Sequence, residues 1–171
     1  MTVLTTTSPS FSNNGTIPAH HTCDHKDISP ALTWTGIPES IKSLVFIIDD
    51  PDPAAPKMTW VPCMLYNIPP NTFGLAEDIT ENDLPIKTLQ GLNDWQRTGY
   101  GGPCPPIGNH RYFHKLYALS NVLQGLQQPT KTILKKAMHG HILPMLNSLD
   151  ATSVGFNQLD PNHNVQNPKI H

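Results

Sequence analysis

Residues 99–119 read GYGGPCPPIGNHRYFHKLYAL, and they are the most informative stretch of this sequence. Its first half combines prolines, which fix φ and remove amide donors, with glycines, which permit tight turns and let a ligand approach the backbone closely. Its second half predicts a strand that runs from His110 to Leu119. A rigid strand that begins directly after such a loop can hold binding residues in place, so the stretch predicts the wall of a pocket.

Two apolar runs upstream of this stretch also predict strands. Residues 43–48 are apolar and end at an Asp-Asp-Pro sequence, as expected of a central strand that is buried on both faces. Residues 60–68 form another run, which a Pro-Pro-Asn turn follows. Shorter strands are expected at residues 31–34 and 153–156.

A single helix is predicted near residues 130–146. Thr130 fits an N-cap, and an apolar stripe at helical spacing follows it, made of Ile133, Leu134, Ala137, Met138 and Ile142. Pro144 should bend or end this helix, because its ring clashes with the carbonyl four residues earlier. Short strands with one C-terminal helix predict a mainly β fold, a Greek-key antiparallel β-sandwich.

Length and composition fit one compact domain. We expect residues 1–150 to form it, and residues 151–171 to form a polar extension that either frays or packs back on the domain. Charged residues make up 14% of the chain and the formal net charge is −2, which argues against a nucleic-acid partner or an anionic membrane surface. No secretory leader or integral membrane segment is evident, so we expect a cytoplasmic protein.

Five blocks of the sequence follow one another in a recognisable order. They are TCD with SPALTW within residues 22–34, DPD at 50–52, LYNIP at 65–69, the 99–119 stretch, and AMHGHIL at 137–143. Together they resemble the phosphatidylethanolamine-binding protein family, and in particular its bacterial Raf-kinase-inhibitor-like branch. The resemblance covers residues 10–146 and implies the β-sandwich of that family.

The resemblance also implies a small anion-binding cavity at one end of the sandwich. The matching positions are Asp50, Asp52, Pro105, Pro106, His110, Arg111 and Tyr112. There a protonated imidazole beside a carboxylate can donate to a phosphate oxygen, and glycine amides can donate to other oxygens. Apart from the resemblance, His110 reads as a strand-end histidine with a structural partner, and Arg111 would face the opposite side of the strand and form a structural ion pair.

Two departures from the family pattern bear on this cavity. Relatives carry TWVHW where residues 59–63 read TWVPC, so Pro62 stands in place of a pocket histidine. The Asp-Pro loop that begins at Asp50 is also shorter than its longer bacterial version. Because proline cannot donate to a central ladder, Pro62 predicts an edge position or a bulge.

Three cysteines leave at least one thiol unpaired. A Cys23–Cys104 bridge is open if the two loops meet, although a reducing cytoplasm disfavours it. Cys104 is interpreted as a packed loop thiol and not as a nucleophile with His110 as its base, because no catalytic cysteine signature surrounds it. Cys63 is interpreted as a small buried residue in place of tryptophan, with a reactive thiol as the alternative.

Residue types that can bind metal gather in the N-terminal loop, at His20, His21, Cys23 and His25. Their spacing matches no familiar zinc pattern. We therefore expect neither a metal site nor a cofactor.

Three functions stay open, and the first is preferred. It is a non-enzymatic module that binds phosphate, a phosphorylated head group or a carboxylate, with a regulatory role. The second is a protein-interaction inhibitor of a kinase or protease in which the pocket is vestigial. The third is a hydrolase, which is disfavoured because no complete set of nucleophile, base and oxyanion donors is apparent.

Overall fold

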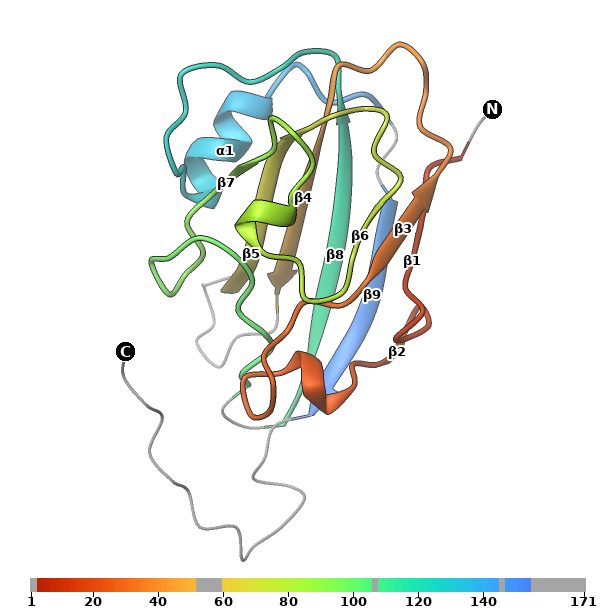
Figure 1. Ribbon diagram of the computed structural model, residues 1–171, viewed down its shortest axis with the longest axis vertical. Coiled ribbons are helices and arrows are strands. Elements are labelled where there is room, and N and C mark those ends of the chain that lie inside the picture. The colour runs from red at the N-terminus through yellow and green to blue at the C-terminus, as the bar shows by residue number, and fades with distance from the viewer. Residues whose placement is uncertain (1–2, 52–59, 106–107, 145–146, 155–171) are drawn as a thin grey trace, which may run out of the picture.

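The computed structural model describes the backbone of residues 3–51, 60–105, 108–144 and 147–154, which form two packed β-sheets and one short helix (Figure 1). The larger sheet has the strand order β2-β9-β8-β4-β5-β7. Its strands are β2 Gly15–Thr16, β4 Ser43–Asp50, β5 Trp60–Ile68, β7 Leu89–Gln90, β8 Asn109–Leu119 and β9 Asn147–Val154. The smaller sheet has the order β1-β3-β6, with β1 Thr5–Thr7, β3 Leu32–Thr35 and β6 Gly74–Leu75.

The larger sheet contains the predicted Greek key. β4, β5 and β7 lie side by side as antiparallel neighbours, and β8 then returns to pair with the other side of β4. This order, in which the fourth strand lies beside the first, is that of the motif, with β6 of the smaller sheet inserted between β5 and β7 in the chain. β9 continues the sheet antiparallel to β8, and β2 pairs parallel with β9. The predicted fold class is therefore confirmed.

β4 is the central strand and is buried on both faces, as its apolar run predicts. Side chains alternate along a strand, so neighbouring residues enter different cores. Phe46 and Ile48 belong to the core between the two sheets, whereas Val45 and Ile47 belong to a second core on the other face. The second core lies beneath the helix, because it includes Leu134 of that helix. The molecule thus has three layers: small sheet, large sheet and helix.

The helix, α1, spans Lys131–Met138. Thr130 is its N-cap, as predicted, and the Thr130 side-chain oxygen accepts a hydrogen bond from the Ile133 amide. Leu134 and Met138 face the sheet and are fully buried, whereas Ile133 is half exposed. The apolar stripe is therefore narrower than the sequence indicates.

α1 ends well before the predicted residue 146, and Pro144 does not end it. Gly140 adopts a left-handed conformation with φ of 80°, which is the usual backbone just past a helix end. The chain then pairs with β8 through a bridge between Ile142 and Leu119. This tertiary pairing removes residues 140–143 from the helix.

Pro62 lies both at an edge and at a bulge, as predicted. β5 pairs with β7 only near its other end, so within the described part of the chain no strand borders β5 on that side beside Pro62. On the β4 side, the register shifts between Ile48 and Asp50, which is the segment that faces Pro62. The absent N–H of proline therefore breaks no ladder bond.

β9 carries the described chain to Val154, so residues 151–154 of the predicted extension lie in the larger sheet. The short strand expected at residues 153–156 is the end of this longer strand, as far as the structure describes it. Residues 155–171 lie outside the described residues. Within the described part, no helix has the length and apolarity that a membrane span requires.

Candidate functional site

A buried histidine–carboxylate pair lies where β4 ends and β8 begins. His110 Nδ1 and Asp50 Oδ2 are 2.7 Å apart, and both side chains are almost completely buried. Asp50 continues the row of Ile48, which faces the smaller sheet, and His110 reaches it from the neighbouring antiparallel strand. The Asp50 carboxylate accepts a hydrogen bond from His110 Nδ1 and so fixes the orientation of the ring. Nε2 is then the ring nitrogen that can contact a ligand.

Tyr112 completes this arrangement from the next inward position of β8, and it is 1% exposed. Burial and then the Asp50 carboxylate raise the pKa of the Tyr112 phenol far above its usual range. The hydroxyl therefore keeps its proton near neutrality and can donate to Asp50. We call Asp50, His110 and Tyr112 the His110 cluster.

Arg111 does not join the His110 cluster. Its side chain is exposed, and its guanidinium carbon lies 5.5 Å from the centre of the Phe113 ring. Because alternate residues of a strand face opposite ways, Arg111 and Phe113 share the face away from His110. The structure thus brings together three of the seven residues that the family resemblance implies and separates Arg111 from them.

Of the other three residues that the resemblance implies, the structure describes only one. Pro105 is buried in the loop that precedes β8. Asp52 and Pro106 lie outside the described residues.

The glycines of the loop before β8 are engaged in packing within the protein. The Gly101 amide donates to the Pro62 carbonyl, and the Gly102 amide donates to Asp27 Oδ1 at 2.6 Å. A Cβ atom on Gly102 would lie 2.3 Å from the His21 carbonyl oxygen, so only glycine fits there. The expectation that such amides donate to an anion is wrong for these two, because both have protein acceptors.

Cys23 and Cys104 form a disulfide. The interpretation of Cys104 as a packed loop thiol is therefore wrong. A hydrogen bond from the Cys23 amide to the Pro103 carbonyl also joins the two loops at this point. Since the cysteines are 81 residues apart, local sequence could not reveal this contact.

Cys63 is the remaining thiol, and it lies in the core between the sheets. Burial raises the pKa of this thiol to about 12. A thiolate therefore does not form near neutrality, and the thiolate is the reactive form. The interpretation of Cys63 as a buried packing residue is confirmed.

A cavity of about 220 Å³ opens beside Cys63, and neither His110 nor Asp50 lines it. Its wall is mostly apolar, with Leu32 and Leu75 among the contributors, and Glu81 is the one charged side chain among the described residues that line it. An acidic, apolar wall does not suit an anion. This cavity therefore lacks the character expected of the predicted anion site.

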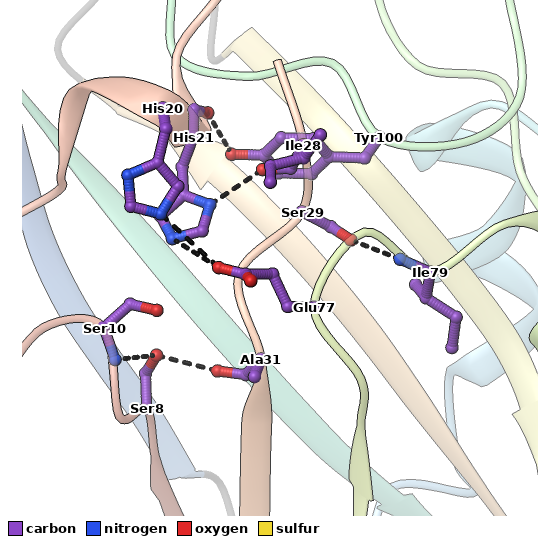
Figure 2. Close-up of polar contacts among 10 residues, drawn as sticks. All are labelled: Ser8, Ser10, His20, His21, Ile28, Ser29, Ala31, Glu77, Ile79 and Tyr100. Atoms are coloured by element: carbon purple, nitrogen blue, oxygen red, sulfur yellow. Dashed lines mark hydrogen bonds and ion pairs between the residues drawn. The ribbon is translucent and has the colours of Figure 1, made fainter. Parts of the chain in front are cut away.

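A second polar cluster gathers where the 3₁₀ turn η1, Ala19–His21, approaches the loop after β6 (Figure 2). His20 Nε2 and His21 Nε2 lie 3.4 and 3.7 Å from Glu77 Oε1. Of the four N-terminal residues singled out in the sequence, Cys23 is bonded to another cysteine and His25 lies outside this cluster. Sequence reasoning missed Glu77, because no local spacing connects it to η1.

Comparison with known proteins identifies the family. The family model described as phosphatidylethanolamine-binding protein matches residues 7–149. The chain belongs to this family. As a member, it is 46% identical to the UPF0098 protein of Methanothermobacter thermautotrophicus over 134 residues, which cover 78% of this chain and 87% of the relative. It is 45% identical to the UPF0098 protein of Aquifex aeolicus over 139 residues, which cover 80% of each chain.

Solved structures of the phosphatidylethanolamine-binding protein family share the fold. A putative homolog from Chlamydia trachomatis superposes with a TM-score of 0.80 at 36% identity, over 89% of this chain and 97% of that chain. YbcL of Escherichia coli, described as a member of the mammalian family, also gives 0.80, at 26% identity over 88% and 98% of the two chains. The resemblance that the five sequence blocks carry is confirmed.

Proposed function

We propose that this chain is a non-enzymatic module that binds a small anion, such as phosphate or a phosphorylated head group, through the His110 cluster. The proposal rests on the buried contact of 2.7 Å between His110 Nδ1 and Asp50 Oδ2. Asp50 accepts the hydrogen bond from Nδ1. A proton on Nε2 can then be donated to an anion, and with both nitrogens protonated that hydrogen bond is charge-assisted.

Family membership supports a ligand-binding role, because the family is described by its binding of phosphatidylethanolamine. Binding of an isolated anion requires fewer contacts with the protein than binding of a whole lipid. A phosphate group can meet a single imidazole at the sandwich end, whereas a lipid also needs contact with its chains. The phosphate chemistry common to both is what the His110 cluster supports.

We expect the affinity to be modest. Pro62 supplies no side-chain donor where the family pattern has a histidine, and the Gly101 and Gly102 amides are engaged elsewhere. One missing charge-assisted hydrogen bond is worth about 1.5–3 kcal/mol, or about ten- to a hundred-fold in affinity.

A binding role is preferred to a hydrolytic one for a chemical reason. A histidine–carboxylate pair acts in covalent catalysis only when it activates a nucleophile. Cys63 is protonated and buried, and Cys23 and Cys104 are joined, so no cysteine can serve. A regulatory role, in which the bound anion changes how the protein meets a partner, fits this module better.

Calorimetric titration with inorganic phosphate and with phosphoethanolamine tests the proposed function. We expect the wild-type chain to bind, and His110→Ala to weaken binding about ten- to a hundred-fold. Arg111→Ala and His139→Ala are matched controls, because both side chains are exposed and lie outside the His110 cluster. Unchanged affinity in His110→Ala would remove the cluster from the site, and no binding by the wild-type chain would favour the protein-interaction inhibitor instead.

A further inference from the structure

We propose that His20, His21 and Glu77 form a binding site for a divalent metal ion of the late first row, with Zn²⁺ as the best fit. The site is separate from the His110 cluster and does not depend on the proposed function. Figure 2 shows both imidazole rings directed at the Glu77 carboxylate, which comes from a different segment of the chain.

The ligand atoms have nearly the spacing that a tetrahedral ion requires. Zinc–nitrogen and zinc–oxygen bonds of about 2.0–2.2 Å place ligand atoms about 3.3–3.6 Å apart. Glu77 Oε1 lies 3.4 Å from His20 Nε2 and 3.7 Å from His21 Nε2. All three ligand atoms lie within 4.8 Å of one another, so small side-chain movements close the site.

His21 is already oriented as a metal ligand. Its Nδ1 lies 2.8 Å from the Ile28 carbonyl oxygen, which can only accept, so Nδ1 carries the proton and Nε2 carries the lone pair. A carbonyl that fixes the ring in this way is typical of metal-bound histidine. The His21 side chain is 0% exposed, and its Nε2 has no hydrogen-bond partner among the described residues.

The contact between His21 Nε2 and the Glu77 carboxylate is unfavourable without a cation, because the Nε2 lone pair and the carboxylate oxygen are both electron-rich and face each other. A metal ion between them would accept the Nε2 lone pair and would offset the charge of the Glu77 carboxylate.

The site is also accessible. The side chains of His20 and Glu77 are 41% and 49% exposed, so an ion can enter from solvent. Three protein ligands leave a fourth coordination position for water, as in open zinc sites. The bound ion would join η1 to the loop after β6 and so attach the N-terminal segment to the smaller sheet.

Calorimetric titration of ZnCl₂ into the disulfide-bonded chain, prepared without a polyhistidine tag, tests the proposal. We expect the wild-type chain to bind one equivalent near neutral pH. Glu77→Gln keeps the shape but removes the anionic ligand, and His20→Gln removes one imidazole. Each should weaken Zn²⁺ binding by about ten-fold or more.

Matched controls separate this site from general surface binding. His25→Gln and Glu81→Gln remove the same chemical groups from exposed positions outside the cluster, and both should bind Zn²⁺ as the wild-type chain does. In the wild-type chain, the ¹⁵N signal of His21 Nε2 should shift on metal addition while circular dichroism stays unchanged. Absence of Zn²⁺ uptake, wild-type affinity in both cluster variants, or equal losses in the controls would each overturn the proposal.

Discussion

At the scale of single residues, two adjacent carboxylates have different roles because strand alternation directs them to opposite faces. Asp50 faces the smaller sheet and contacts His110. Asp49 faces α1, where Lys115 Nζ and Lys131 Nζ each lie 3.0 Å from its Oδ2. The Asp-Asp sequence alone does not distinguish these roles, which depend on what packs against each face.

We expect Cys63 to resist thiol reagents in the folded protein. Burial raises its pKa to about 12, whereas an unfolded cysteine ionises near about 8.5. A water-soluble aromatic disulfide reagent at mildly alkaline pH should therefore detect no thiol in the native chain and one thiol per chain in denaturant without reductant. Rapid labelling of the native chain would contradict the buried placement.

The same shift in Cys63 affects stability at high pH. The unfolded chain loses the thiol proton above about pH 8.5, while the folded chain retains it up to about pH 12. The folded chain then binds more protons, so this group lowers the free energy of unfolding as the pH rises through that window. Cys63→Ala should reduce this alkaline loss of stability in urea titrations.

At the scale of elements, α1 is held to the larger sheet by an apolar face and by the ion pair between Lys131 and Asp49. Asp49→Ala would leave two ammonium groups together without their buried carboxylate. We expect a loss of about 2–3 kcal/mol in urea unfolding, below the usual cost of breaking a buried pair because both lysines reach solvent. Lys131→Met, which keeps the contact between Lys115 and Asp49, should cost less. Equal stability of Asp49→Ala and the wild-type chain would show that the ion pair between Lys131 and Asp49 does not stabilise the fold.

The Cys23–Cys104 disulfide holds the N-terminal loop against the loop that precedes β8. Closing a loop of 81 residues restricts the unfolded chain, and such bonds stabilise by about 2–4 kcal/mol. We expect Cys104→Ser and the double variant with Cys23→Ser to lose the same stability, because each removes one bond. The reduced wild-type chain should match them. A reductant that leaves the wild-type unfolding midpoint unchanged would contradict this account.

The elements that the sequence predicts well are those whose signals are local. The apolar runs at residues 43–48 and 60–68 are strands because continuous burial on both faces is visible in the sequence. The predicted end of α1 is wrong because the left-handed conformation of Gly140 and the pairing of Ile142 with β8 depend on tertiary contacts, which the local sequence does not show. The sequence leaves the Cys23–Cys104 bridge open for the same reason, because it forms only where two distant loops meet.

At the scale of the whole molecule, the family pattern marks the pair that the sequence identifies in full, whereas of the second cluster the sequence singles out only His20 and His21. His110 and Asp50 meet as the pattern implies, since β4 and β8 are neighbours in the family fold. Glu77 carries no pattern, and it contacts η1 from a segment more than fifty residues away in the sequence. Sites assembled from distant loops are therefore the part that requires coordinates.

The Cys23–Cys104 disulfide is also relevant to the cellular compartment of the protein. A cytoplasmic location is a prediction from the sequence, whereas disulfides persist mainly in oxidising compartments, with intracellular proteins of hyperthermophiles as an exception. The bond between Cys23 and Cys104 therefore favours an environment that keeps it oxidised. Thiol counting on protein purified under alkylating conditions distinguishes the bonded state from the reduced one.

Binding of a small anion by the His110 cluster can be followed directly through the histidine ring signals during a phosphate titration. Proton–nitrogen NMR spectra of the imidazoles report each ring separately. We expect the His110 Nε2 signal to shift in a saturable manner, while His139 and His141, which are exposed and remote in sequence, stay unchanged apart from ionic-strength effects. An unchanged His110 ring at phosphate concentrations that saturate the calorimetric signal would contradict the claim.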